Sequence, residues 1–239
     1  MKTKTSFLIY ALTIGLLMLS NGCSKDDTNS IEKDNDKNVV KDVDGNIYKV
    51  ITIGTQTWMA ENLRTTNYND GTAILLIKDN QTWANTYRKQ DPAYCWYDNN
   101  YVTYGNTFGA LYNWNAVKTG KLCPKGWHVS TDAEWTDLTD FLGGLDKAGD
   151  QLKEKGTKNW QSPNTGANNN SGFTAIPGGR RSSLNGEFTH IGANGSWWTA
   201  TQHLDRFAWQ ITMGFSISNT VRNTSGWVEG YSVRCVKDK

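Results

Sequence analysis

The chain has 239 residues, with 25 basic and 23 acidic side chains and a formal net charge of +2. Aromatic residues make up 12% of the sequence, and 11 of them are tryptophans, so large ring surfaces are plentiful. The nearly balanced charge lacks the basic excess that binds phosphate backbones, and composition therefore argues against a nucleic-acid partner.

The N-terminus is predicted to be a secretory leader. Lys2 and Lys4 precede an apolar run over residues 7–19, which is shorter than the roughly 20 residues that a spanning helix needs. The segment Leu19–Cys23 then resembles a bacterial lipobox. We expect residues 1–22 to be removed and Cys23 to be lipidated, which leaves 217 residues with 23 basic and 23 acidic side chains. The alternative is an ordinary signal peptide with an incidental cysteine.

Residues 23–38 are predicted to form a flexible tether. The segment is rich in lysine, aspartate and asparagine and has one large apolar residue, Ile31, so it cannot bury enough surface to offset its ordering entropy. Ser24–Asp27 resembles the acidic export signal of surface lipoproteins. We therefore expect an outer-membrane lipoprotein that is exposed at the cell surface and touches the membrane through its lipid. A plain solvated linker is the alternative.

Residues 39–239 are predicted to form one α+β domain. Two β-rich runs between residues 40 and 53 surround Asp44 and Gly45, which is a strong hairpin signal. Residues 65–103 show few periodic apolar positions and are predicted to be irregular. Residues 108–117 are predicted to be helical.

The clearest predicted helix covers residues 131–142. Thr131 and Glu134 have capping-box spacing, and Trp135, Leu138 and Leu142 form one apolar stripe. A shorter helix over 148–155 and a polar loop over 157–172 are predicted to follow. The remaining chain is predicted to form short strands at 173–181, near 188, and at 196–201, 207–213, 216–222 and 231–236.

Three cysteines follow Cys23, namely Cys95, Cys123 and Cys235. An extracytoplasmic compartment permits disulfides. Three cysteines allow three single pairings, and the spacing alone does not choose between them.

Several ordered blocks of the sequence resemble the Fibrobacter succinogenes major paralogous domain family. The blocks are Val43–Tyr48, Ile53–Leu63, Tyr112–Trp114, Cys123–Val129, Glu134–Trp135, Gly172–Phe173, Pro177–Arg180, Trp197–Thr201 and Tyr231–Val236. The resemblance spans about residues 39–237. It implies a C-type-lectin-like fold, with two main helices beside a twisted antiparallel sheet and long loops. It also implies a disulfide between Cys123 and Cys235, which leaves Cys95 unpaired.

The resemblance implies no particular activity. The calcium motifs of sugar-binding C-type lectins are absent, as is the C-terminal cysteine pair of the formylglycine-generating enzymes that share this broad fold. The sequence also lacks a nucleophile motif and a metal-ligand spacing. We therefore expect a non-enzymatic binding module without metal or cofactor, whose ligand is a glycan, a peptide or a partner protein.

Aromatic rings with a few polar groups suit such ligands. The candidate ligand-binding residues are Trp197, Trp198, Trp209, Trp227, Tyr231, Arg180 and Arg181. For each tryptophan the alternative is a place in the core, and for the arginines it is pairing with acids or carbonyls. At the level of the whole chain, the alternatives are a structural display protein of the cell envelope and an enzyme acting on polysaccharide.

Overall fold

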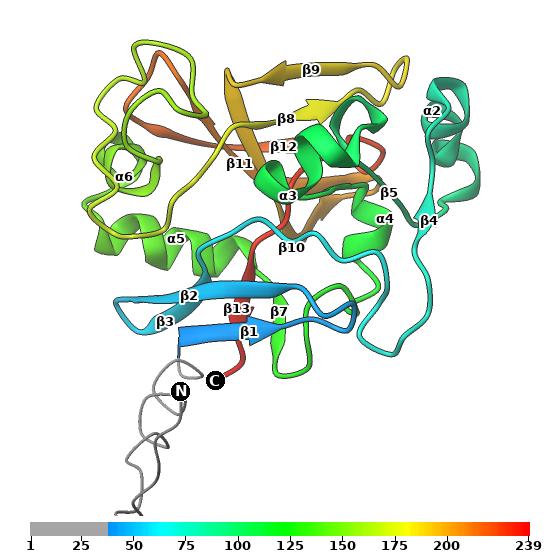
Figure 1. Ribbon diagram of the computed structural model, residues 1–239, viewed down its shortest axis with the longest axis horizontal. Coiled ribbons are helices and arrows are strands. Elements are labelled where there is room, and N and C mark those ends of the chain that lie inside the picture. The colour runs from blue at the N-terminus through cyan, green and yellow to red at the C-terminus, as the bar shows by residue number, and fades with distance from the viewer. Residues whose placement is uncertain (1–37) are drawn as a thin grey trace, which may run out of the picture.

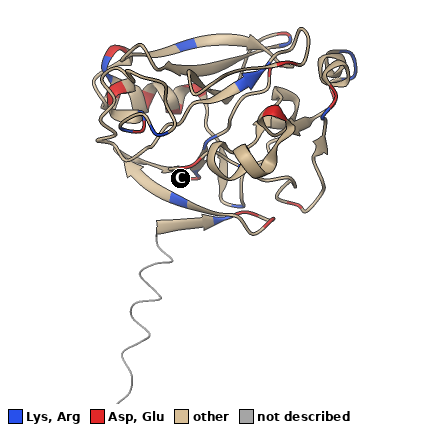
Figure 2. Ribbon diagram, turned by 45° about the horizontal axis from the view of Figure 1, so that its top comes forward, with Lys and Arg blue, Asp and Glu red and all other residues tan. Residues whose placement is uncertain are grey.

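The computed structural model describes residues 38–239 and is an α+β fold (Figure 1). The predicted leader, the predicted lipidation site Cys23 and all but the last residue of the predicted tether lie outside the described residues. Within residues 38–239, no helix combines the length and the apolar character that crossing a bilayer requires. Basic and acidic residues are interspersed over the elements (Figure 2).

Two five-stranded sheets and one small sheet organise the domain. The first sheet is antiparallel and has the order β1-β2-β3-β13-β7; the second has the order β12-β11-β10-β8-β9, with only the β10–β8 pair parallel. The strands of the first sheet are β1 (Val39–Lys41), β2 (Ile47–Ile53), β3 (Gln56–Met59), β13 (Cys235–Lys237) and β7 (Trp127–Val129). Those of the second are β12 (Thr220–Gly226), β11 (Phe207–Gly214), β10 (Asn194–Leu204), β8 (Gly178–Arg181) and β9 (Phe188–Ile191).

The third sheet and the helices fill the middle of the chain. The strands are β4 (Leu75–Leu76), β5 (Ala93–Cys95) and β6 (Leu111–Tyr112), in that order. The helices are α2 (Asn80–Lys89), α3 (Asn106–Phe108), α4 (Trp114–Val117), α5 (Asp132–Phe141) and α6 (Leu145–Leu152), with helical turns at Tyr97–Asn99 and Tyr101–Gly105.

The predicted hairpin and the predicted helix over 131–142 are confirmed. Gly45 takes a φ of +87° in the turn between β1 and β2, a conformation that glycine adopts without a side-chain clash. Helix α5 begins with the predicted capping box of Thr131 and Glu134. Its apolar stripe is buried, and the Trp135 ring packs 5.0 Å from that of Trp58 on β3, so one face of α5 packs onto the core beside the first sheet.

The disulfide between Cys123 and Cys235 is also confirmed. Their Cα atoms are 6.0 Å apart, and both residues are buried. The bond joins the loop before β7 to β13, which pairs with both β7 and β3. Thus the last strand of the chain, which lies between β3 and β7, is linked covalently to the segment that leads into β7.

Two predictions for the middle of the chain are wrong. Residues 65–103 are not wholly irregular, because they contain β4, α2 and β5. Residues 108–117 are not one helix. Gly109 has a φ of +76°, and a side chain there would come within 2.7 Å of the Leu63 carbonyl oxygen, so the backbone passes close to Leu63 and breaks between α3 and β6.

Three buried cations stabilise the irregular segments. Arg234 donates to the carbonyls of Met59, Phe173 and Thr174 and to Asn62 Oδ1. Burial lowers the pKa of Arg234 to about 9, which leaves the guanidinium charged at neutral pH. The other two buried cations, Arg181 and Lys153, also donate to backbone carbonyls; those that accept from Lys153 are Thr165, Gly214 and Ile217.

Candidate functional site

Trp197 and Trp198 are core residues and cannot form the surface platform expected of them. Both rings are fully buried. Successive residues of a strand point to opposite faces of the sheet, and both faces of β10 are covered at this point. Trp197 donates to Asn62 Oδ1 at 2.8 Å on one side, and Trp198 donates to the Tyr112 carbonyl at 2.9 Å on the other. The sequence pattern predicts the strand, but it does not show that other parts of the chain cover both of its faces.

Arg181 is likewise a structural residue and not a ligand-binding one. It is fully buried and donates to the carbonyls of Ile77, Lys78 and Gly186. Its guanidinium lies 4.6 Å from the Trp83 ring centroid and also contacts a phenylalanine ring of β9. Arg181 therefore attaches the N-terminal end of α2 to the β8–β9 turn.

Trp209 lies apart from the other candidates. It is half-buried, and the Arg222 guanidinium sits 3.5 Å from its ring centroid. Arg222 in turn forms two 2.6 Å hydrogen bonds with the Asp132 carboxylate at the start of α5. One face of the Trp209 ring is thus already occupied by a cation, and the four tryptophans do not gather into one platform.

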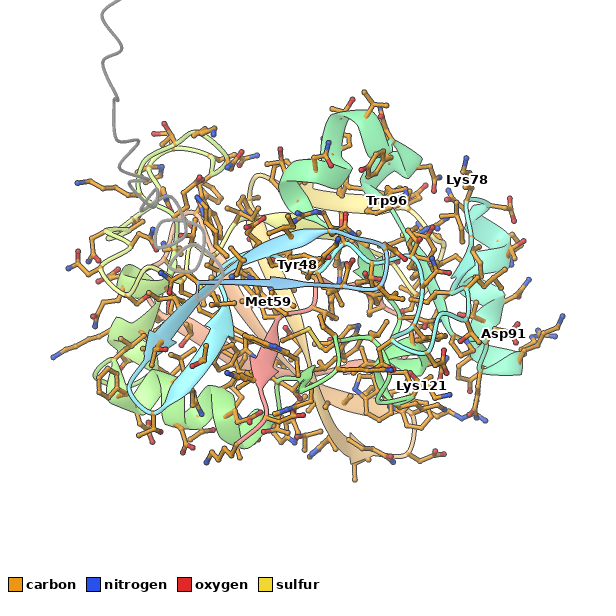
Figure 3. All side chains as sticks on the ribbon, turned by 60° about the horizontal axis from the view of Figure 1, so that its bottom comes forward. Tyr48, Met59, Lys78, Asp91, Trp96 and Lys121 are labelled. Carbon is orange, nitrogen blue, oxygen red and sulfur yellow. A yellow bond between two sulfur atoms is a disulfide. The ribbon has the colours of Figure 1, made fainter. Side chains whose placement is uncertain are left out.

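Trp227 does line a cleft, which has a volume of about 620 Å³. Helix α2 forms one wall, and Figure 3 shows this helix at the edge of the molecule between the labelled residues Lys78 and Asp91. The opposite wall comes from the β10–β11 turn and from the segment after β12. The lining includes Tyr87, Arg88, Asn115, Leu184, Arg206, Phe207 and Trp227.

Two of the lining residues each carry a fully buried polar atom that has no partner within the described residues. The atoms are Asn115 Oδ1 and Trp227 Nε1, on side chains that are 1% and 9% exposed. The indole of Trp227 is held in place by Trp114, stacked at 4.8 Å, and by the Lys118 ammonium, 4.3 Å from the ring centroid. An unpaired buried donor or acceptor costs about 1–3 kcal/mol, so this wall of the cleft carries a local energetic cost.

The rim of the cleft is apolar and basic. Tyr87, Leu184 and Phe207 are 55%, 90% and 46% exposed. The Arg206 guanidinium lies 4.5 Å from the Tyr87 ring centroid, and Arg88 is on the same helix as Tyr87. Exposed apolar side chains around a concave site with fixed polar groups are typical of a binding cleft.

Arg180 and Tyr231 meet in a second, smaller hollow of about 330 Å³ on the face of the second sheet. Most of its lining side chains carry a hydroxyl or an amide, and Arg180 and His190 are the basic residues among them. Of the seven candidate residues, one therefore lies in the cleft, two lie in the hollow, and four lie elsewhere.

The imidazole of His128 on β7 lies between two carboxylates, one on α5 and one near the C-terminus. His128 Nε2 is 2.8 Å from Glu134 Oε1, and His128 Nδ1 is 2.6 Å from Asp238 Oδ1. Hydrogen bonding to Glu134 raises the pKa of His128 to about 9, so the imidazole is charged at neutral pH and cannot act as a general base. Burial raises the pKa of the Cys95 thiol to about 12, which keeps it protonated. Residues 38–239 contain no group of three metal-ligating side chains suited to an ion.

Sequence reasoning missed most of the cleft. Tyr87 and Asn115 belong to segments whose predicted structure was wrong. The sequence does contain signals for helix α2. Asp79 caps the helix by accepting from the Thr82 N–H, and Arg88 and Lys89 lie in its last turn.

Comparison with known proteins gives one match. A family model described as the Fibrobacter succinogenes major domain matches residues 51–237. No curated protein and no solved structure matches the chain.

Proposed function

The chain belongs to the Fibrobacter succinogenes major domain family, and we propose that it is a lipid-anchored, non-enzymatic binding module at the cell surface. The leader-like residues 1–22, the cysteine directly after them and the polar segment that follows support an outer-membrane anchor. The helices α5 and α6 beside antiparallel strands, with the Cys123–Cys235 disulfide, support a C-type-lectin-like fold. The charged state of His128 and the protonated state of Cys95 support binding rather than catalysis.

The ligand site of this module is the cleft between α2 and the β10–β11 turn. The observation that carries the proposal is the set of exposed apolar side chains, Tyr87, Leu184 and Phe207, that line a cleft together with Arg88 and Arg206. A volume of about 620 Å³ accommodates a few residues of a peptide.

The ligand is a segment of a partner protein that carries an apolar side chain next to an acidic one. Leu184 and Phe207 provide apolar contact for the first side chain. The cations Arg88, Arg206 and Lys118 lie at the cleft or against its Trp227 wall, whereas Asp205 is the single acidic residue of the lining. This excess of positive charge favours an acidic partner and accelerates its association.

A random-sequence peptide display library, selected on the purified full chain, tests the proposal. We expect enriched peptides to combine an aromatic or aliphatic residue with aspartate or glutamate. Tyr87→Ala and Leu184→Asp should each weaken binding of an enriched peptide about tenfold, because truncation of an interface anchor typically costs more than 1 kcal/mol. Both side chains are largely exposed, so the variants should fold normally.

Val102→Asp is the matched control. Val102 is 88% exposed like Leu184 but lies outside the cleft, so this charge should leave binding unchanged. Peptides that bind all variants equally would rule out the cleft. A glycan array signal that Tyr87→Ala abolishes would identify a glycan as the ligand instead, and no ligand from either screen would favour the structural display alternative.

The anchor is tested separately with Cys23→Ala. In cells that express the full chain, metabolic labelling with a fatty-acid analogue should mark the wild type, and the variant should lose both the label and its membrane association. An unlabelled wild-type chain would refute lipidation without bearing on the cleft.

A further inference from the structure

The hollow on the second sheet is built by side-chain alternation. Ser196 on β10, Gln210 and Thr212 on β11, and Asn223 and Ser225 on β12 all point to the same face of the sheet. Ser196 is directly opposite Thr212, and Gln210 is opposite Asn223. Three adjacent strands thus place five hydroxyl and amide side chains on one face, which they share with Trp198, Ala208 and Val221.

The hydrogen bonds within this set are directional. The Thr212 hydroxyl donates to Gln210 Oε1 at 2.7 Å, so the neighbouring Ser196 hydroxyl, at 2.9 Å, must donate to Thr212 Oγ1. Because Gln210 Oε1 already accepts this hydrogen bond, the Nε2 group of the same amide is the part that remains available to donate. This nitrogen has no hydrogen-bond partner within residues 38–239, although only 5% of the residue's surface is exposed. Gln210 is therefore a nearly buried, oriented donor that lines an open hollow.

The charges around the hollow nearly cancel. Arg180 Nη1 lies 3.8 Å from Glu229 Oε2, and the Arg180 Nε group donates to Thr189 Oγ1. The Tyr231 hydroxyl is 3.0 Å from Ser225 Oγ, and burial raises the pKa of Tyr231, so it stays neutral. A nearly neutral site rich in groups that both donate and accept does not favour an anion. It matches the hydroxyl groups of a sugar, which also donate and accept.

We propose that this hollow binds one neutral sugar ring, as a second site independent of the cleft. Its volume of about 330 Å³ is at the lower end of the range for small-molecule sites and fits a single ring rather than an extended chain. Gln210 Nε2 donates to a ring hydroxyl. Asn223, which is exposed at the rim, offers its amide to another hydroxyl.

Saturation-transfer NMR on the full chain tests this site. The probes are methyl α-mannoside, methyl β-galactoside and the methyl β-glycoside of N-acetylglucosamine. We expect saturable transfer to at least one probe, and about fivefold weaker binding in Gln210→Met, since that variant removes one hydrogen bond at nearly constant volume. Asn223→Ala should weaken binding similarly, and this exposed position keeps the test valid if Gln210→Met folds poorly.

Thr224→Val is the control on the same strand, because Thr224 points to the opposite face of the sheet from Asn223. This variant should bind the probe with wild-type affinity. No saturable transfer to any probe, or equal binding by Asn223→Ala and the wild type, would overturn the proposal. Displacement of the probe by inorganic sulfate at lower concentration would also overturn it, in favour of an anion site. Loss of peptide binding at the cleft would leave these outcomes unaffected.

Discussion

Removal of the disulfide is expected to cost the protein a large part of its stability. Cys123 and Cys235 are 112 residues apart, so the bond closes more than half of the described chain into a loop. In the chain-entropy treatment, a loop of this length destabilises the unfolded state by about 5 kcal/mol. Domains typically have unfolding free energies of about 5–15 kcal/mol, so the double variant Cys123→Ala/Cys235→Ala should lose a third or more of the total.

Urea denaturation followed by tryptophan fluorescence measures this loss. With a slope of about 2.5 kcal/mol/M, the midpoint should fall by about 2 M. The matched control is Cys95→Ala, which removes one buried sulfur atom without opening the loop. Reduced wild-type protein should behave like the double variant. A loss of less than about 1 kcal/mol relative to the control would refute the loop-closure reasoning.

Three further predictions concern single side chains. The pKa of His128 is raised from 6.5 to about 9, so the stabilisation from the charged imidazole is complete below pH 6.5 and disappears as pH rises through 9. Thermal melting temperatures measured against pH should show this decline, and the decline should be absent in His128→Gln. Arg234→Met leaves several buried carbonyls unpaired and should lower the unfolding free energy by about 3 kcal/mol or more in urea, whereas a loss below about 1 kcal/mol would contradict this role. Asp79→Ala removes the cap of α2 and should cost about 1 kcal/mol, seen as faster hydrogen exchange of α2 amides; unchanged exchange would show that packing alone holds the helix.

The parts of the fold that followed from sequence are those governed by local chemistry. The Asp44–Gly45 turn and the Thr131–Glu134 capping box act over a few residues, so their patterns predict structure directly. Helix α2 was missed because its mean composition is polar and only Trp83 and Thr86 are buried. The break at Gly109 depends on the approach of a segment more than 40 residues away, which no local pattern contains.

The candidate sites followed from sequence only in part. Trp227, Arg180 and Tyr231 line concave surfaces, but composition could not distinguish them from Trp197 and Trp198. That distinction depends on whether a second element covers the strand face. Likewise, the unpartnered state of the Trp227 indole became visible only once every neighbouring group was in place.

Arg181, Lys153 and Arg234 have a consequence for how this domain can change over time. Each of these cations engages main-chain oxygens, most of them in irregular segments, and every amino acid supplies such an oxygen. The path of those segments is therefore specified by a few interior residues, and the outward side chains along them are not needed to maintain it. The same interior can thus support many different exteriors, so new recognition properties can arise by surface substitution without redesign of the scaffold.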